Sequence, residues 1–189
     1  LTKSLVHPYV PRFPRHVSYD LVLFGSWRRK GVYVGEKQIA SPGSYPVAGF
    51  NFAPMYNLNY KLRFGVSLDG VYDGSANVYT EDALVEYDAG SGSSRRKFLV
   101  PGIQNQLALG LSGRAEYVMP FFTIGVGLGT NVLGRGDLRG LYQVFALKID
   151  MTRSSFLHIG YNLQNFQTPN YLMLGLGFRF NNKYPKVRH

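Results

Sequence analysis

Apolar and polar residues alternate with a period of two along most of this chain. The clearest example is residues 60–72, where the even positions are mostly large and apolar and the odd positions are charged or small. Successive side chains of a β-strand point to opposite faces, whereas an α-helix, with a period of about 3.6 residues, would mix the two sets. Residues 60–72 are therefore predicted to form a strand with one apolar face and one polar face.

Seven further segments show the same alternation, so eight strands are predicted in total. In the first of them, Val22 and Phe24 are apolar residues on the otherwise polar face. The second contains Pro46 and Pro54, which lack a ladder N–H and are expected near strand ends or at a bulge. The seven segments are residues 17–27, 45–57, 103–117, 121–133, 141–150, 157–164 and 172–180.

Eight alternating strands predict an all-β fold, an antiparallel up-and-down barrel, but they leave the direction of its faces open. A soluble barrel of the lipocalin type would turn its apolar faces inward. A transmembrane barrel is favoured because the polar faces carry small residues and charge pairs suited to a narrow lumen. The apolar faces are bulky, with tyrosines near segment ends, where membrane barrels carry an aromatic girdle. The pairs expected in the lumen are Arg63 with Asp69 and Arg114 with Glu116.

The links between these segments differ in length. Those at about residues 28–44 and 73–99 are long, whereas residues 58–59 and 119–120 form tight turns. Outer-membrane barrels have short periplasmic turns and longer extracellular loops, so we expect a bacterial outer-membrane location with both termini in the periplasm. The corresponding division of the chain is a proline-rich periplasmic lead (1–16), the barrel (17–180) and a short periplasmic tail (181–189).

The composition agrees with a membrane barrel. Hydrophobic residues make up 45% of the chain, its mean hydropathy is −0.11, and it has no apolar run long enough for a transmembrane helix. A barrel strand needs only about 9–11 residues, of which every second one faces lipid. The net charge of +10 is scattered and matches no nucleic-acid-binding motif, so anionic lipid headgroups are the favoured partner and nucleic acid is not expected.

The sequence offers no site for a metal or a cofactor. It has no cysteine, and its four histidines lack the spacing of metal ligands. Gly125, Gly127 and Gly129 recur at the strand period, which indicates close packing in the lumen rather than a nucleotide-binding loop. We therefore expect neither a metal nor a cofactor.

Residues 157–180 carry the one informative local pattern, a histidine at His158 followed by Pro169-Asn170. This arrangement resembles the PagL-type lipid A 3-O-deacylases, outer-membrane barrels that are also grouped with acyloxyacyl hydrolases. The pattern of that family is His-x-Ser-Asn, then Pro-Asn, then a glutamate in the last strand. The resemblance implies an ester hydrolysis in which serine attacks, histidine takes its proton and glutamate orients the histidine.

Two of these three catalytic groups are missing from the matching positions. Gly160 stands where the serine belongs, and no carboxylate occurs between Met151 and His189. Ser154 and Ser155 precede the histidine and lie too early in the strand to replace the serine. By strand parity His158 shares the lumenal face with Gly160, so it is interpreted as a hydrogen-bonded structural histidine. No catalytic residue is assigned, and His158 is a candidate only if the protein is a deacylase.

The resulting hypothesis is a non-catalytic PagL-like barrel. It would act as a structural or interaction subunit of an outer-membrane protein assembly, with lipid A as a further contact. Its expected partners are outer-membrane lipid or lipopolysaccharide and other outer-membrane or periplasmic proteins. The low-complexity residues 88–94 mark a loop with a candidate binding role, and a filled eight-stranded interior argues against a channel. The alternative is a lipid A 3-O-deacylase or a related lipid esterase.

Overall fold

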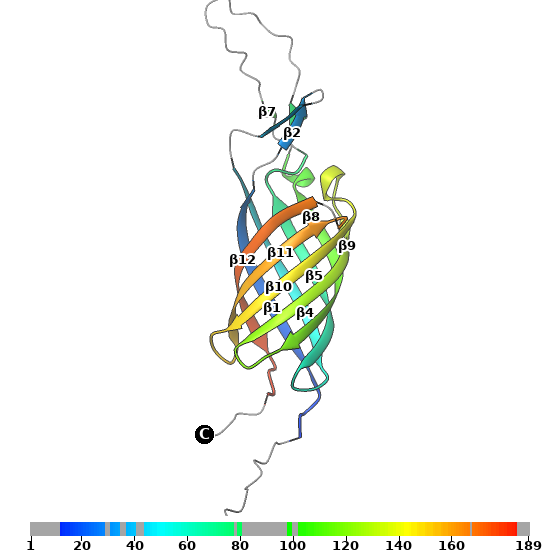
Figure 1. The fold of residues 1–189 in the computed structure, drawn as a ribbon. Helices are drawn as coiled ribbons and strands as arrows, with labels where there is room; N and C mark the ends of the chain where they lie inside the picture. The colour runs from blue at the N-terminus through cyan, green and yellow to red at the C-terminus, as the bar shows by residue number, and fades with distance from the viewer. Residues whose placement is uncertain are drawn as a thin grey trace, which may run out of the picture.

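The protein forms a closed barrel of eight antiparallel strands (Figure 1). The computed structural model describes residues 12–28, 31–34, 37–40, 44–77, 79–80, 98–99, 102–166 and 168–184. No helix within these residues is both long and apolar enough to cross a membrane. The predicted all-β, up-and-down barrel is confirmed.

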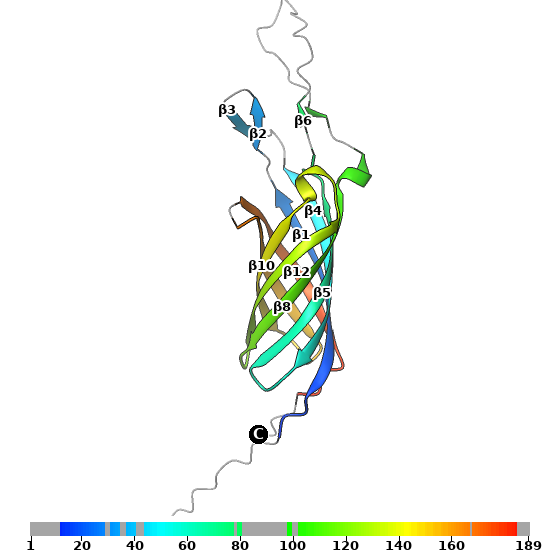
Figure 2. The same cartoon turned by 90° about the vertical axis from the view of Figure 1, so that its right-hand side faces the viewer.

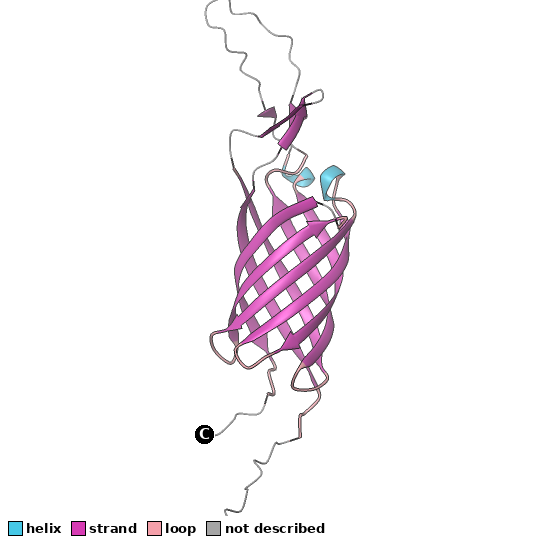
Figure 3. Ribbon diagram, viewed as in Figure 1, coloured by secondary structure: helices cyan, strands magenta, loops and turns pink. Residues whose placement is uncertain are grey.

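Each barrel strand pairs with its neighbour along the chain, and the first strand pairs with the last to close the ring. Two short hairpins and two 3₁₀ turns stand at the end of the barrel opposite the C-terminal tail (Figures 2 and 3). The barrel strands are β1 (His16–Arg28), β4 (Tyr45–Asn57), β5 (Leu62–Asp73), β8 (Leu107–Val118), β9 (Phe122–Leu133), β10 (Leu141–Asp150), β11 (Ser155–Gln164) and β12 (Thr168–Phe180). The other elements are β2 (Gly31–Val34), β3 (Lys37–Ala40), β6 (Tyr79–Thr80), β7 (Phe98–Leu99), η1 (Ile103–Asn105) and η2 (Gly136–Leu138).

The faces of the barrel are those of a membrane protein. Leu23 and Val66 point outward and are 54% and 60% exposed, whereas Arg63 on the lumenal face is 0% exposed. Exposed apolar surface of this extent would be unstable in water and is stable against hydrocarbon. The prediction that the apolar faces point outward, as in a transmembrane barrel, is confirmed, and the soluble lipocalin-type alternative is wrong.

Several predicted strand limits differ from the structure. The segment predicted to start at Ile103 starts at Leu107, because Ile103–Asn105 form a 3₁₀ turn held by hydrogen bonds from the Asn105 and Gln106 amides to the Gly102 and Ile103 carbonyls. The last strand begins at Thr168, four residues before its predicted start, and the two longest links contain the hairpins β2–β3 and β6–β7. Residues 1–11, 88–94 and 185–189 lie outside the described residues.

The apolar residues that interrupt the pattern of β1 are lumenal. Phe24 stacks on Tyr171 with ring centroids 6.2 Å apart, and it belongs to an apolar cluster with Val47 and Met173 in the upper lumen, near the hairpins. Pro54 lies inside β4 rather than at its end, and the β4–β5 ladder passes from the Phe52–Leu68 pair directly to the Met55–Gly65 pair. Pro46, the second residue of β4, is near a strand end as predicted, whereas Pro54 is not, and the register of the ladder is the same on both sides of it.

Candidate functional site

His158 lies on the lumenal face of β11, between Lys148 of β10 and Gly175 of β12. It is 2% exposed, so the lumenal position inferred from strand parity agrees with the structure. Neither ring nitrogen has a hydrogen-bond partner among the described residues, so the hydrogen bond expected for this side chain is not formed there. A histidine without a base-orienting carboxylate or an adjacent hydroxyl has no catalytic pair.

The position of the missing nucleophile is occupied by neighbouring side chains. A Cβ atom built on Gly160 would lie 2.6 Å from Met173 Cε and 2.8 Å from His158 Nε2. Residues 172–174 are the stretch in which the glutamate of the family pattern would fall, and Met173 is the residue of this stretch that faces inward. The structure therefore brings His158, Gly160 and Met173 together without forming a triad.

The remaining residues of the sequence-based pattern lie away from His158. Ser154 and Ser155 belong to the β10–β11 turn region, where both backbone amides donate to Thr152 Oγ1. The Ser155 and Thr152 hydroxyls are 2.7 Å apart. Both serines are therefore engaged in a local turn, and the Pro169 and Asn170 side chains are outside the part described.

A network of buried ions fills the lower lumen, on the side of the chain termini. Asp20 accepts hydrogen bonds from Lys148 Nζ at 2.8 Å, Arg63 Nη2 at 3.0 Å and Arg179 Nε at 3.1 Å. Glu116 accepts from Arg63 Nε at 2.6 Å and pairs with Lys148 Nζ at 2.6 Å. These five residues connect strands β1, β5, β8, β10 and β12.

Charge is balanced within this network. Its three cations face Asp20, Glu116 and, at the rim, Asp150, which pairs with Arg179 Nη1 at 3.4 Å. Phe156 of β11 lies beneath two of the cations, with Lys148 Nζ 5.0 Å and the Arg179 guanidinium carbon 5.1 Å from its ring centroid. Buried charges require partners of this kind because desolvation of an unpaired ion is costly.

The predicted partners of the lumenal ions are wrong. Arg63 pairs with Glu116, its direct cross-strand neighbour in the β5–β8 ladder, and Arg114 pairs with Asp69 at 2.9 Å. Arg63 and Asp69 are six residues apart on one strand, or about 20 Å at the usual rise per residue. The partner of a lumenal ion therefore depends on the register between strands, and closeness in the sequence does not predict it.

Asp69 is the centre of a second polar network in the upper lumen. Its carboxylate accepts hydrogen bonds from the Tyr142 hydroxyl at 2.6 Å and from Arg114 Nη2 at 2.9 Å. Three further donors complete its shell: Asn51 Nδ2, Ser67 Oγ and Ser112 Oγ. The sequence pattern placed these residues on polar faces, but it gave no sign that they converge on one carboxylate.

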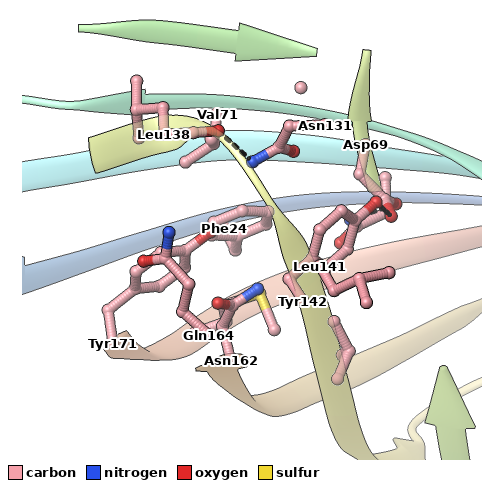
Figure 4. A pocket seen from close by; sticks show the side chains of 14 residues that line it. Phe24, Asp69, Val71, Asn131, Leu138, Leu141, Tyr142, Asn162, Gln164 and Tyr171 are labelled. Carbon is pink, nitrogen blue, oxygen red and sulfur yellow. Dashed lines mark hydrogen bonds between the residues drawn. The ribbon is translucent and has the colours of Figure 1, made fainter. Parts of the chain in front are cut away.

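A small cavity of about 30 Å³ remains above this network (Figure 4). Its wall combines Phe24, Tyr171 and Met173 with polar groups such as Asn131 and Asn162. Asn131 donates to the Leu138 carbonyl at 2.6 Å, which ties the β9 end to η2. A space of this size holds only a few water molecules. The described lumen is thus packed by its own side chains, as an eight-stranded barrel is expected to be.

Aromatic side chains close the opposite mouth of the lumen. Phe13 packs edge-to-face on Tyr60 and Tyr184, with centroid distances of 4.8 and 5.0 Å. The Lys183 amide donates to His16 Nε2, and His16 Nδ1 lies 2.7 Å from the Pro14 carbonyl, so the ring connects the two terminal segments. Burial raises the pKa of the Tyr184 phenol above its ordinary value. The tail at residues 181–184 is therefore packed against the barrel.

The described residues contain no group of three or more histidine, aspartate or glutamate side chains arranged to hold a metal ion. The buried carboxylates instead bind the cations of the protein itself. What the geometry defines is a transmembrane β-barrel with a self-filled, charge-balanced lumen.

A family model described as the C-terminal domain of acyloxyacyl hydrolase, PagL_C, matches residues 17–182. The chain belongs to this family of outer-membrane β-barrels, and the family resemblance seen in residues 157–180 is confirmed. The match covers the whole barrel rather than the local pattern alone. It places the protein in the bacterial outer membrane.

Solved structures of two bacterial proteins are similar to this one. Ail, the attachment invasion locus protein of Yersinia pestis, in complex with the heparin analogue sucrose octasulfate, has 12% identity and a TM-score of 0.44 over 87% of this chain and 98% of that one. Neisserial surface protein A (NspA) has 14% identity and a TM-score of 0.42 over 87% of this chain and 95% of that one. No curated protein matches the sequence.

Proposed function

We propose that this protein is a non-catalytic member of its family, a barrel that serves as a structural or interaction subunit in the outer membrane. Its termini lie in the periplasm, its outer wall contacts lipid, including lipid A, and its ends contact other envelope proteins. The observation that carries this proposal is the burial of His158 in the lumen, beside Gly160 and Met173, without a nucleophile or an orienting acid.

The position of His158 argues against acyl transfer. An ester bond of a membrane lipid lies outside the barrel wall, whereas the imidazole is on the inner face of β11. A general base must reach the proton that it removes, either directly or through one water molecule. Since the wall of backbone hydrogen bonds separates the two, His158 is better suited to packing than to catalysis.

Charge supports contacts with anionic partners at the ends of the barrel. Arg135 and Arg139 are exposed beside the hairpins, and Arg12, Arg15 and Lys61 are exposed at the opposite end. Basic side chains near a membrane surface attract anionic headgroups. The overall charge of +10 is consistent with this role.

The alternative is a lipid A 3-O-deacylase or a related lipid esterase, an activity of the kind that the family description names. It would require a nucleophile and an acid other than those of the usual pattern. Mass spectrometry of lipid A distinguishes the two functions. We expect identical acyl-chain patterns in cells that contain the protein, lack it, or carry His158→Ala. A protein-dependent loss of one acyl chain that disappears in His158→Ala would overturn the proposal.

Co-purification tests the interaction role. The full chain, extracted in mild detergent after crosslinking in intact cells, is expected to retain the same envelope proteins in repeated preparations. An unrelated eight-stranded barrel expressed at the same level is the control for nonspecific capture. Recovery of the chain with no partner beyond those of the control would contradict the proposed role as a subunit.

A further inference from the structure

The outer wall of the barrel carries an apolar groove near the end that bears the hairpins. It has a volume of about 480 Å³, within the range of about 300–1,000 Å³ that is usual for small-molecule sites. It spans strands β4, β5, β8 and β9, on a part of the wall that does not include His158. Its outward-facing walls are formed by Ala48, Phe50, Gly70, Tyr72, Leu107 and Leu133.

Small residues and a local irregularity create the hollow. Ala48 is an outward residue of β4, and its neighbours on the adjacent strands are Gly25 and Tyr72. Phe50 fills the space above Gly70, where a Cβ atom would lie 2.3 Å from Phe50 Cε1, so its ring forms the wall of the groove at that point. The β8–β9 ladder also shifts register between Leu109 and Gly110, and Leu133 at its end is 62% exposed. The groove is therefore an open recess in the apolar outer surface of these strands.

The surroundings of the groove determine what it can bind. Because it opens on the outward face of a transmembrane barrel, it faces hydrocarbon chains rather than water. A straight alkyl chain matches its apolar lining. Such a chain belongs to a membrane lipid, since the described wall offers hardly any polar groups to hold another ligand.

A cation stands beside the upper end of the groove. Arg135 follows Leu133 by two residues, and its Nη1 donates to Asn105 Oδ1, two residues before Leu107. The hydrogen bond thus connects two residues that each lie two positions from a groove residue, Leu133 or Leu107. It is exposed, and no ion pair connects it to a carboxylate among the described side chains. A phosphate is the anionic group that a membrane lipid presents at this depth.

We infer that this groove binds one acyl chain of a phosphorylated lipid of the outer leaflet, with the phosphate on Arg135. The inference rests on the orientation in the proposed function, in which the hairpin end faces outward. It adds a fixed lipid site, remote from His158, to a general contact with the bilayer. A bound lipid of this kind would exchange more slowly than the lipids that surround the rest of the wall.

Native mass spectrometry tests the site. The full chain is reconstituted in phosphatidylcholine nanodiscs that contain diphosphorylated lipid A as the probe, and the retained lipid is counted after release into detergent. We expect about one retained lipid A per barrel, and about tenfold weaker retention in Ala48→Phe, which fills the groove. Ala115→Phe is the matched control, because Ala115 also faces outward but lies outside the groove.

The headgroup contact has its own control. Arg135→Ala is expected to weaken retention of the diphosphorylated probe but not of a dephosphorylated one, whereas Arg153→Ala, an exposed residue of the turn at the opposite end of the barrel, changes neither. Equal retention in Ala48→Phe and Ala115→Phe would overturn the inference, because the lipid would then be annular only. Ala48→Leu serves the same comparison if the larger side chain prevents folding. Unchanged acyl patterns in cells remain the separate test of the non-catalytic role.

Discussion

Asp20 shows how single residues hold this barrel together. It binds cations from three other strands and is almost completely buried. Its role resembles that of Asp69 in the upper lumen, where one carboxylate collects five donors. At this scale the protein is stabilised by a few carboxylates that each connect several strands.

Replacement of Asp20 by alanine is expected to destabilise the barrel by about 3–5 kcal/mol, because the three buried cations would then share only Glu116 and the partly exposed Asp150, which leaves buried positive charge uncompensated. Asp150→Ala is the control: this acid also contacts Arg179, but it is partly exposed, and a loss of only about 0–1 kcal/mol is expected. Urea unfolding in detergent micelles, followed by the fluorescence of the single tryptophan, Trp27, measures both. Equal stability of the two variants would contradict a central role of Asp20.

At the scale of elements, the period of two was sufficient to predict all eight barrel strands and both of their faces. It failed where tertiary contacts decide. Ile103 continues the alternation but lies in a 3₁₀ turn, and Phe24 interrupts the polar face of β1 because it packs in the lumen with Val47 and Met173. Val22 is buried on the same face. The partners of Arg63 and Arg114 depend on strand register, which alternation does not contain.

The same limit applies to the candidate site. Strand parity placed His158 in the lumen, and the family pattern identified Gly160 as the missing serine. The position of Met173 beside both could not be read from the sequence, since it depends on how β12 pairs with β11. The outer groove was missed as well. Its only signal was Ala48, a small residue on the apolar face of its segment.

Strand glycines can be ranked by the space around them. A Cβ atom on Gly175 would lie 2.1 Å from the Leu23 carbonyl oxygen, which is backbone and cannot move aside, whereas on Gly113 it would meet only the Leu128 carbonyl oxygen at 4.0 Å. Gly175→Ala is expected to cost about 1–3 kcal/mol by crowding the β1–β12 pair. Gly113→Ala should change stability by less than about 0.5 kcal/mol. The same urea titration compares them, and an unperturbed Gly175→Ala barrel would refute this ranking.

At the scale of the whole molecule, the two ends of the barrel differ. One end carries the chain termini and three short turns, at residues 58–61, 119–121 and 151–154, and the other carries the hairpins (Figure 1). This asymmetry is typical of outer-membrane barrels, in which short turns face the periplasm. It supports the proposed orientation.

The absence of cysteine from the sequence makes this orientation easy to test. In intact cells, a maleimide polymer too large for porins is expected to label Arg139→Cys, at the hairpin end, but not Pro120→Cys, in a turn at the other end. Permeabilising the outer membrane should make both sites reactive, which controls for local burial. Labelling of Pro120→Cys alone in intact cells would reverse the topology.

The seam of the barrel joins the first strand to the last. Seven residue pairs connect β1 with β12, from Tyr19–Phe180 to Gly25–Leu174, whereas thirteen connect β1 with β4. A nascent chain that lacks β12 would have two unpaired edges, and hydrocarbon cannot solvate the free amides and carbonyls of these edges. The strands therefore cannot enter the bilayer one at a time. Insertion has to wait until the C-terminal strand is available to close the cylinder.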